Sequence, residues 1–148
     1  MDQIKSYADL EVWKNAKNLA KEIYLVTNSF PTHEQYGLVA QLRRASVSVP
    51  SNIAEGCGRN SSKDTVRFLF IARGGLYEIE TQIILAHELG FITHDETKEK
   101  ILEMVNTSKK LLNGFISYYS KLDSSIVNEP EELYRKHDQQ PATDNEQL

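Results

Sequence analysis

Apolar residues recur every three or four positions along four successive segments of this 148-residue chain. This spacing aligns apolar side chains on one face of a helix, and that face is then buried against other helices. No segment alternates between apolar and polar residues for long enough to indicate a strand. The chain is therefore predicted to be all-α. The four series are Trp13, Ala16, Ala20, Ile23 and Thr27; Leu38, Leu42, Ala45 and Val49; Phe68, Ala72, Gly75, Ile79 and Ala86; and Ile101, Val105, Ser108, Leu112, Phe115, Tyr119 and Leu122.

Short polar sequences, glycines and one proline indicate where the helices begin and end. Each connection spans only a few residues, so successive helices must run in opposite directions. We predict an antiparallel up-down-up-down four-helix bundle over residues 1–122. Four sequences resemble the capping box that opens a helix, namely Ser6-x-x-Asp9, Thr32-x-x-Gln35, Ser61-x-x-Asp64 and Thr93-x-x-Glu96. The stop signals are Asn28–Pro31, Gly56 with Gly58, and Gly90.

Two local features depart from the regular pattern. Pro50 falls inside the second helix, where it removes a backbone donor, and we expect a kink near it. Ser46 and Ser48 could bond to local carbonyls and accommodate the bend. The alternative is two helices with a break near Ser48. Gly74-Gly75 lies in the middle of the third helix, which indicates close approach of a neighbouring backbone.

The third helix is apolar on more than one side. Phe68–Ile71 and Ile83–Leu85 are continuous apolar runs, and these cannot all point into one bundle core. A helix that is apolar nearly all round is usually buried on both sides. We therefore predict that its outer face meets another subunit, the alternative being scattered surface hydrophobic residues.

The charge is divided unevenly along the chain. Residues 1–122 hold 15 Lys and Arg against 14 Asp and Glu, so this part is near +1. Residues 123–148 hold 2 basic and 7 acidic residues, which gives −5 and accounts for the net charge of −4. This Ser-, Pro- and Glu-rich segment is predicted to be a mobile acidic tail.

The sequence favours a cytoplasmic protein with no membrane association. No apolar run approaches the roughly 20 residues that a spanning helix needs. The first residues lack the basic start and apolar stretch of a secretory signal. A single cysteine, Cys57, cannot form an internal disulfide.

Catalytic and metal-binding patterns were sought and not found. Helical di-metal sites use Glu-x-x-His pairs, but none of the four histidines has an acidic residue three positions before it. Gly56-Cys57-Gly58 lacks the Gly-Lys-Ser/Thr that completes a phosphate-binding loop. Nothing near Cys57 in the sequence would activate its thiol. We predict a protein that is not an enzyme and has no cofactor and no metal.

Basic residues recur at helical spacing in two stripes and one pair. The ordinary interpretation of such stripes is a solvated charged face. Repeated around an oligomer, however, they could form a track for a phosphate backbone. The first stripe is Lys14, Lys17 and Lys21, the second is Arg59, Lys63 and Arg67, and the pair is Arg43-Arg44.

Two carboxylates, Glu55 and Glu78, lie near glycines and could be close to the core. A buried carboxylate needs a cation or several donors. We predict that they form structural ion pairs with Arg43 or Arg44 of the second helix, and the alternative is a ligand site.

Several of these motifs together resemble the 23S rRNA intervening-sequence protein family, also called the four-helix-bundle protein family. The resemblance covers about residues 6–122. It implies a small bundle that forms a ring-like homopentamer. Some relatives, the accessory variability proteins of diversity-generating retroelements, bind nucleic acid through a basic surface and partner a reverse transcriptase. The matching motifs are Asp9–Trp13, Phe30–Leu38, Gln41–Ala45, Ser48–Gly56, Ile71–Glu78 and Leu89–Ile92.

The leading hypothesis from the sequence is a bacterial homopentamer with salt-sensitive, sequence-nonspecific binding to RNA or DNA. The basic stripes and the arginine pair are its candidate contacts. The acidic tail would oppose binding if it folded over them. The alternative hypothesis is a protein-interaction scaffold with no nucleic-acid role.

Overall fold

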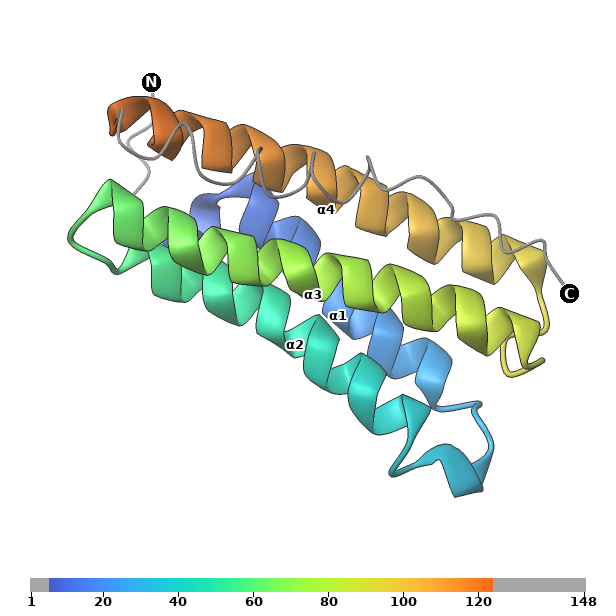
Figure 1. The fold of residues 1–148 in the computed structure, drawn as a ribbon. Coiled ribbons are helices and arrows are strands. Elements are labelled where there is room, and N and C mark those ends of the chain that lie inside the picture. The colour runs from blue at the N-terminus through green and yellow to red at the C-terminus, as the bar shows by residue number, and fades with distance from the viewer. Residues whose placement is uncertain (1–5, 124–148) are drawn as a thin grey trace, which may run out of the picture.

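A computed structural model describes residues 6–123 of the chain and consists of four long helices (Figure 1). They are α1 (Glu11–Thr27), α2 (Leu38–Cys57), α3 (Ser62–Glu88) and α4 (Asp95–Leu122). Two short 3-10 turns, Tyr7–Asp9 and Thr32–Glu34, precede α1 and α2. Within residues 6–123 no strand occurs, so the all-α prediction is confirmed. The predicted tail beyond Asp123 lies outside the described residues.

The four helices form a closed bundle in which each packs against two others. The contacting pairs are α1–α2, α2–α3, α3–α4 and α1–α4. Helices α2 and α3 pack antiparallel. Thr65 of α3 donates a hydrogen bond to the Gly56 carbonyl of α2, and farther along α3 Gln82 donates to Gln41 of α2. The end of α2 and the start of α3, which the connection joins, therefore lie together. The start of α2 lies near the end of α3.

The buried residues follow the predicted stripes closely in α2 and in α4 as far as Leu112, beyond which Phe115 and Tyr119 are half-buried, and less closely in α1. In α1, Val12 and Leu19 are buried in the core of the bundle. Trp13 and Ala20, which were predicted for that stripe, are half-buried. At the end of α4, Leu122 is largely exposed. A series that steps by three and four averages 3.5 residues, so it drifts from the core face of a helix with 3.6 residues per turn. The fully buried large side chains are Leu19, Ile23, Leu42, Val49, Ile53, Leu69, Leu76, Ile79, Ile83, Ile101, Val105 and Leu112.

The predicted stop signals are confirmed, since Asn28 follows the last residue of α1 and Gly58 that of α2, whereas among the predicted starts only that of α3 is confirmed. Ser61 caps α3, since its Oγ accepts a hydrogen bond from the Asp64 amide at 3.1 Å. Gly90 ends α3 with a φ of +81°, and the amide of Phe91 reaches the Ala86 carbonyl at 2.9 Å, as in a Schellman cap. Glycine is required here because the left-handed conformation strains other residues.

Three predicted capping boxes do not open α-helices. Ser6 caps the first 3-10 turn instead of α1. Thr32 begins the second 3-10 turn, and the carboxylate of Glu34 accepts from the Leu38 amide at the start of α2. The residue before α4 is His94, not Thr93. In the first two cases a short turn is inserted before the helix, and the local pattern could not show this.

Pro50 lies within a continuous helix, because α2 extends from Leu38 to Cys57. The alternative of two helices with a break near Ser48 is therefore wrong. The Ser46 hydroxyl donates to the Arg43 carbonyl at 2.9 Å, and the Ser48 hydroxyl donates to the Ala45 carbonyl at 2.7 Å. These bonds agree with the predicted role of the two serines next to a proline, and the kink itself stays a prediction.

Of the two adjacent glycines in α3, only Gly75 faces α2 closely. A Cβ atom at Gly75 would lie 2.9 Å from Val49 Cγ2 and 3.0 Å from Ser48 Oγ. A Cβ atom at Gly74 would meet no atom within 4 Å. The predicted close approach is thus confirmed at Gly75, and it brings α3 against the segment of α2 that contains Pro50.

Candidate nucleic-acid interface

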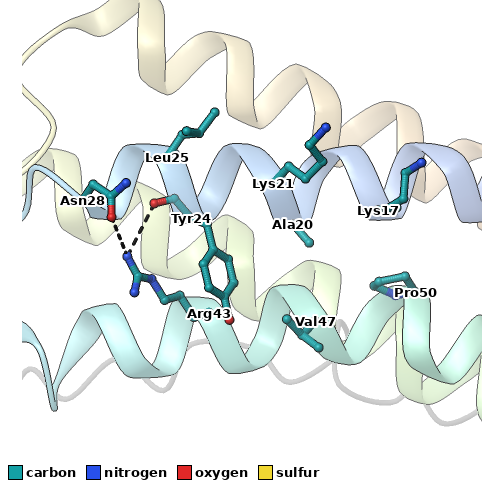
Figure 2. Close-up of a pocket in the computed structure, with 9 residues that line it drawn as sticks. All are labelled: Lys17, Ala20, Lys21, Tyr24, Leu25, Asn28, Arg43, Val47 and Pro50. Carbon is teal, nitrogen blue, oxygen red and sulfur yellow. Dashed lines mark hydrogen bonds between the residues drawn. The ribbon is translucent and has the colours of Figure 1, made fainter.

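A groove of about 480 Å³ runs between α1 and α2 on the surface of the bundle (Figure 2). Its walls combine exposed apolar side chains with positively charged ones. Three of the eight predicted basic contacts, namely Lys17, Lys21 and Arg43, line it. The other lining residues are Ala20, Tyr24, Leu25, Asn28, Val47 and Pro50.

Arg43 is held in place across the groove by the end of α1. Its Nε donates to Thr27 Oγ1 at 3.0 Å, and its Nη2 donates to Asn28 Oδ1 at 3.0 Å and reaches the Tyr24 carbonyl at 3.5 Å. The last carbonyls of a helix lack internal partners and carry partial negative charge, so a guanidinium is favoured there. All three partners are neutral, so no carboxylate of the described residues cancels the charge of Arg43.

Lys17 and Lys21 lie one helical turn apart on α1, about 6 Å along its axis. The Nζ atom of Lys17 lies 5.3 Å from the centre of the Trp13 ring, a cation–π distance. Within residues 6–123, neither lysine forms an ion pair. Lys14, the third residue of this stripe, pairs with Glu11 at 3.6 Å. In the part of the chain that the structure describes, the groove therefore has three cations without acidic partners.

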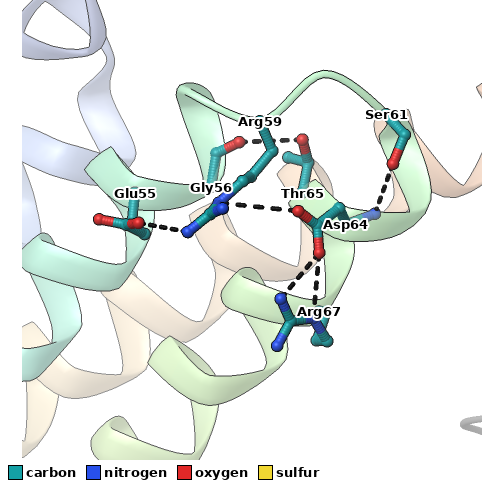
Figure 3. A network of polar contacts seen from close by, with 7 residues as sticks. All are labelled: Glu55, Gly56, Arg59, Ser61, Asp64, Thr65 and Arg67. Carbon is teal, nitrogen blue, oxygen red and sulfur yellow. Dashed lines mark hydrogen bonds and ion pairs between the residues drawn. The ribbon is translucent and has the colours of Figure 1, made fainter.

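The second basic stripe lies at the connection between α2 and α3, and its arginines are paired with acids (Figure 3). Arg59 forms ion pairs with Glu55 and, at 3.6 Å, with Asp64. Asp64 also accepts from Arg67 at 2.8 Å. The guanidinium carbons of Arg59 and Arg67 lie 4.4 and 4.7 Å from the centre of the Phe68 ring. These charges are therefore largely compensated locally.

A sequence profile described as 23S rRNA-intervening sequence protein matches residues 8–114. The match includes α1, α2, α3 and most of α4, and every residue that lines the groove. The chain belongs to this family. Among curated proteins, no match is found.

A solved structure shares the fold of this intervening-sequence family member. It is a protein of unknown function from the S23 ribosomal protein family of Bacteroides thetaiotaomicron, 24% identical, with a TM-score of 0.64. The alignment covers 71% of this chain and 97% of that one. At this identity the likeness supports the bundle fold alone.

In the structure of the intervening-sequence protein, the predicted ion pairs of Glu55 and Glu78 with Arg43 or Arg44 do not form. Glu55 pairs with Arg59 rather than with Arg43 or Arg44. Glu78 and Arg44 are exposed, and among residues 6–123 neither takes part in an ion pair. The prediction assumed carboxylates near the core, where pairing is required. Both carboxylates face solvent instead, and Arg43 is engaged by the end of α1.

The groove was not predicted as a unit, because its apolar part comes from two helices. Tyr24 follows Lys17 and Lys21 at helical spacing, so its place on the same face could be inferred. Val47 and Pro50 join it only because α2 packs against α1. The predicted Lys63 and Arg44 are exposed and lie outside the groove lining. The basic set is therefore divided between the groove and the remaining surface.

Other chemical features of the intervening-sequence protein are limited in the part of the chain described. Residues 6–123 contain no group of three His, Cys, Asp or Glu side chains that could hold a metal ion. Burial raises the pKa of the Cys57 thiol, which disfavours the reactive thiolate. Over the same range, no helix has the length and apolar content needed to cross a bilayer.

Proposed function

We propose that this intervening-sequence protein is a non-enzymatic, homo-oligomeric nucleic-acid-binding protein whose main contact surface is the α1–α2 groove. The observation that carries the proposal is the set of three cations, Lys17, Lys21 and Arg43, that surround the groove and have no carboxylate partner among residues 6–123. A phosphate backbone supplies the missing negative charge at regular intervals. Binding of this kind releases counterions and does not depend on the base sequence.

The paired arginines at the α2–α3 connection are a weaker phosphate site than the groove. Arg59 and Arg67 would have to exchange Glu55 and Asp64 for phosphate, and the acids would repel the same backbone. Among residues 6–123, the groove cations have no acidic partner that would compete with phosphate in this way. We therefore assign the main phosphate contacts to the groove residues Lys17, Lys21 and Arg43 rather than to all eight predicted basic residues.

The proposal is tested by titrating the full chain with a fluorescent single-stranded oligonucleotide at several salt concentrations. We expect binding at low salt that weakens steeply as salt rises, with a log–log slope of about −2 for three phosphate contacts in one subunit. RNA and DNA should bind similarly, since the groove cations contact phosphates. Absence of binding even at low salt contradicts the proposal and favours the protein-interaction scaffold.

The proposed homo-oligomer is supported by the outer face of α3. Ile71, Ile84, Leu85 and Leu89 are each between 40% and 55% exposed, although they are large apolar residues. Exposed large apolar residues of this kind are often found in protein–protein contacts. Association through it would repeat the α1–α2 groove in every subunit and multiply the phosphate contacts.

Sedimentation equilibrium of the pure chain tests the oligomer. A pentamer gives a mass of about 84 kDa, five times the 16.9 kDa of the chain. Ile84→Asp should lower this mass, because burying an unpaired carboxylate in an apolar contact is strongly unfavourable. Glu88→Gln, an exposed change on the same helix, is the control. A monomer at micromolar concentration contradicts the proposed assembly.

A further inference from the structure

Tyr24 places an aromatic ring inside the basic groove. The ring extends from α1 toward α2 between Arg43 and Val47 (Figure 2). The guanidinium carbon of Arg43 lies 4.7 Å from the centre of the Tyr24 ring, and Tyr24 is 43% exposed. Because Asn28 and Thr27 hold the guanidinium, it forms a fixed partner for the ring. The groove therefore contains a preformed aromatic and cationic surface.

The remaining groove surface is apolar and open. Leu25 is 63% exposed and Val47 is 44% exposed, and Ala20 and Pro50 complete the lining. A phosphate backbone alone would leave this apolar surface uncovered. An unpaired base would cover it with a flat aromatic face and keep its own phosphates within reach of the lysines. The volume of about 480 Å³ falls in the range of sites that hold small organic groups, about 300–1,000 Å³.

We infer, on the basis of the proposed function, that the groove binds single-stranded nucleic acid, with an unpaired base against Tyr24 and neighbouring phosphates at Lys17 and Lys21. In a duplex the bases are stacked on each other and cannot turn a face toward Tyr24. Stacking on aromatic side chains and on guanidinium planes is how single strands are held without sequence preference. Exposed Tyr24 and fixed Arg43 provide the stacking part of such a contact, and the two lysines, which form no ion pair within residues 6–123, provide the phosphate part.

Three probes of equal length separate base binding from phosphate binding in the full-length protein. They are a 12-nucleotide thymidine strand, a strand of 12 abasic nucleotides and a 12-base-pair duplex, all compared at one salt concentration. The abasic strand keeps the phosphates and lacks the bases. We expect the thymidine strand to bind at least about fivefold more tightly than the abasic strand, the lower end of the effect of stacking one base.

Tyr24→Ala should remove this preference, with a loss of about 5- to 150-fold for the thymidine strand and little change for the abasic strand. Tyr24→Phe keeps the ring and should retain the preference, which separates stacking from loss of the hydroxyl. Tyr118→Ala, at an exposed tyrosine of α4, is the matched control.

The outcomes distinguish the inference from the proposed function. Equal binding of the thymidine and abasic strands overturns the single-strand inference and leaves phosphate binding in place. Tighter binding of the duplex than of the thymidine strand also overturns it. Failure of all three probes to bind contradicts the proposed function itself. Binding of poly-glutamate as tight as that of the thymidine strand overturns the inference in favour of an acidic peptide.

Discussion

Replacing both Lys17 and Lys21 with glutamate is expected to lower the affinity for a single strand by at least about 25-fold at 0.1 M salt. Each phosphate contact to a single strand contributes about 0.7 to the slope of log affinity against log salt. One contact therefore makes the affinity at 0.1 M salt roughly fivefold higher relative to that at 1 M salt. Losing two such contacts lowers the affinity by about 25-fold. Repulsion between the new carboxylates and the phosphates lowers it further. Both lysines are exposed, so the fold should tolerate the change.

The matched control is Lys110→Glu with Lys121→Glu. These two lysines are exposed on α4, outside the groove lining, and the double substitution changes the net charge by the same amount. The control should alter affinity by no more than about threefold, since these two lysines do not line the groove and salt screens exposed charges. Equal losses in both double variants would show that net charge, rather than the groove, determines binding. Fluorescence anisotropy titration of the same oligonucleotide measures all three proteins.

Ile79→Ala is expected to lower the free energy of unfolding by about 2–5 kcal/mol, a large part of the stability of a domain this size. Ile79 is fully buried near the middle of α3, in a core to which all four helices contribute. Removing its side chain loses apolar burial and leaves a cavity that the surrounding helices fill only in part. Urea denaturation followed by circular dichroism measures the change.

Glu78→Ala provides the control for this substitution on the same helix. Glu78 is exposed and is not among the residues of the proposed oligomer contact, so truncation there removes little from the core. We expect a shift within about 1 kcal/mol. A similar loss for the two variants would contradict the assignment of the inner and outer faces of α3.

The sequence predicted the helices well because their patterns are long and repeat many times. In α4 the stripe from Ile101 to Leu112 is buried as expected, over several turns. Helix ends depend on single residues, so they were less predictable. Ser61 and Gly90 match their predicted roles, whereas Thr32 begins a 3-10 turn that shifts the start of α2 to Leu38.

The candidate site was predictable only in part, because it depends on how two helices pack. Lys17 and Lys21 share a face of α1 through local spacing, which a sequence shows directly. Arg43 joins them through bonds to Thr27 and Asn28, which are 16 and 15 residues away in the chain. Glu55 could not be placed either, because its partner Arg59 extends back from the connection after α2.

The salt dependence of binding, measured side by side for the wild type and the Lys17→Glu/Lys21→Glu variant, tests the groove assignment most directly. Because the slope counts phosphate contacts, it separates a lost contact from a general loss of affinity. We predict that the slope for the single strand becomes shallower by about 1.4, or 0.7 for each lysine per subunit bound. The same slope in both proteins would contradict the assignment of phosphate contacts to the α1–α2 groove.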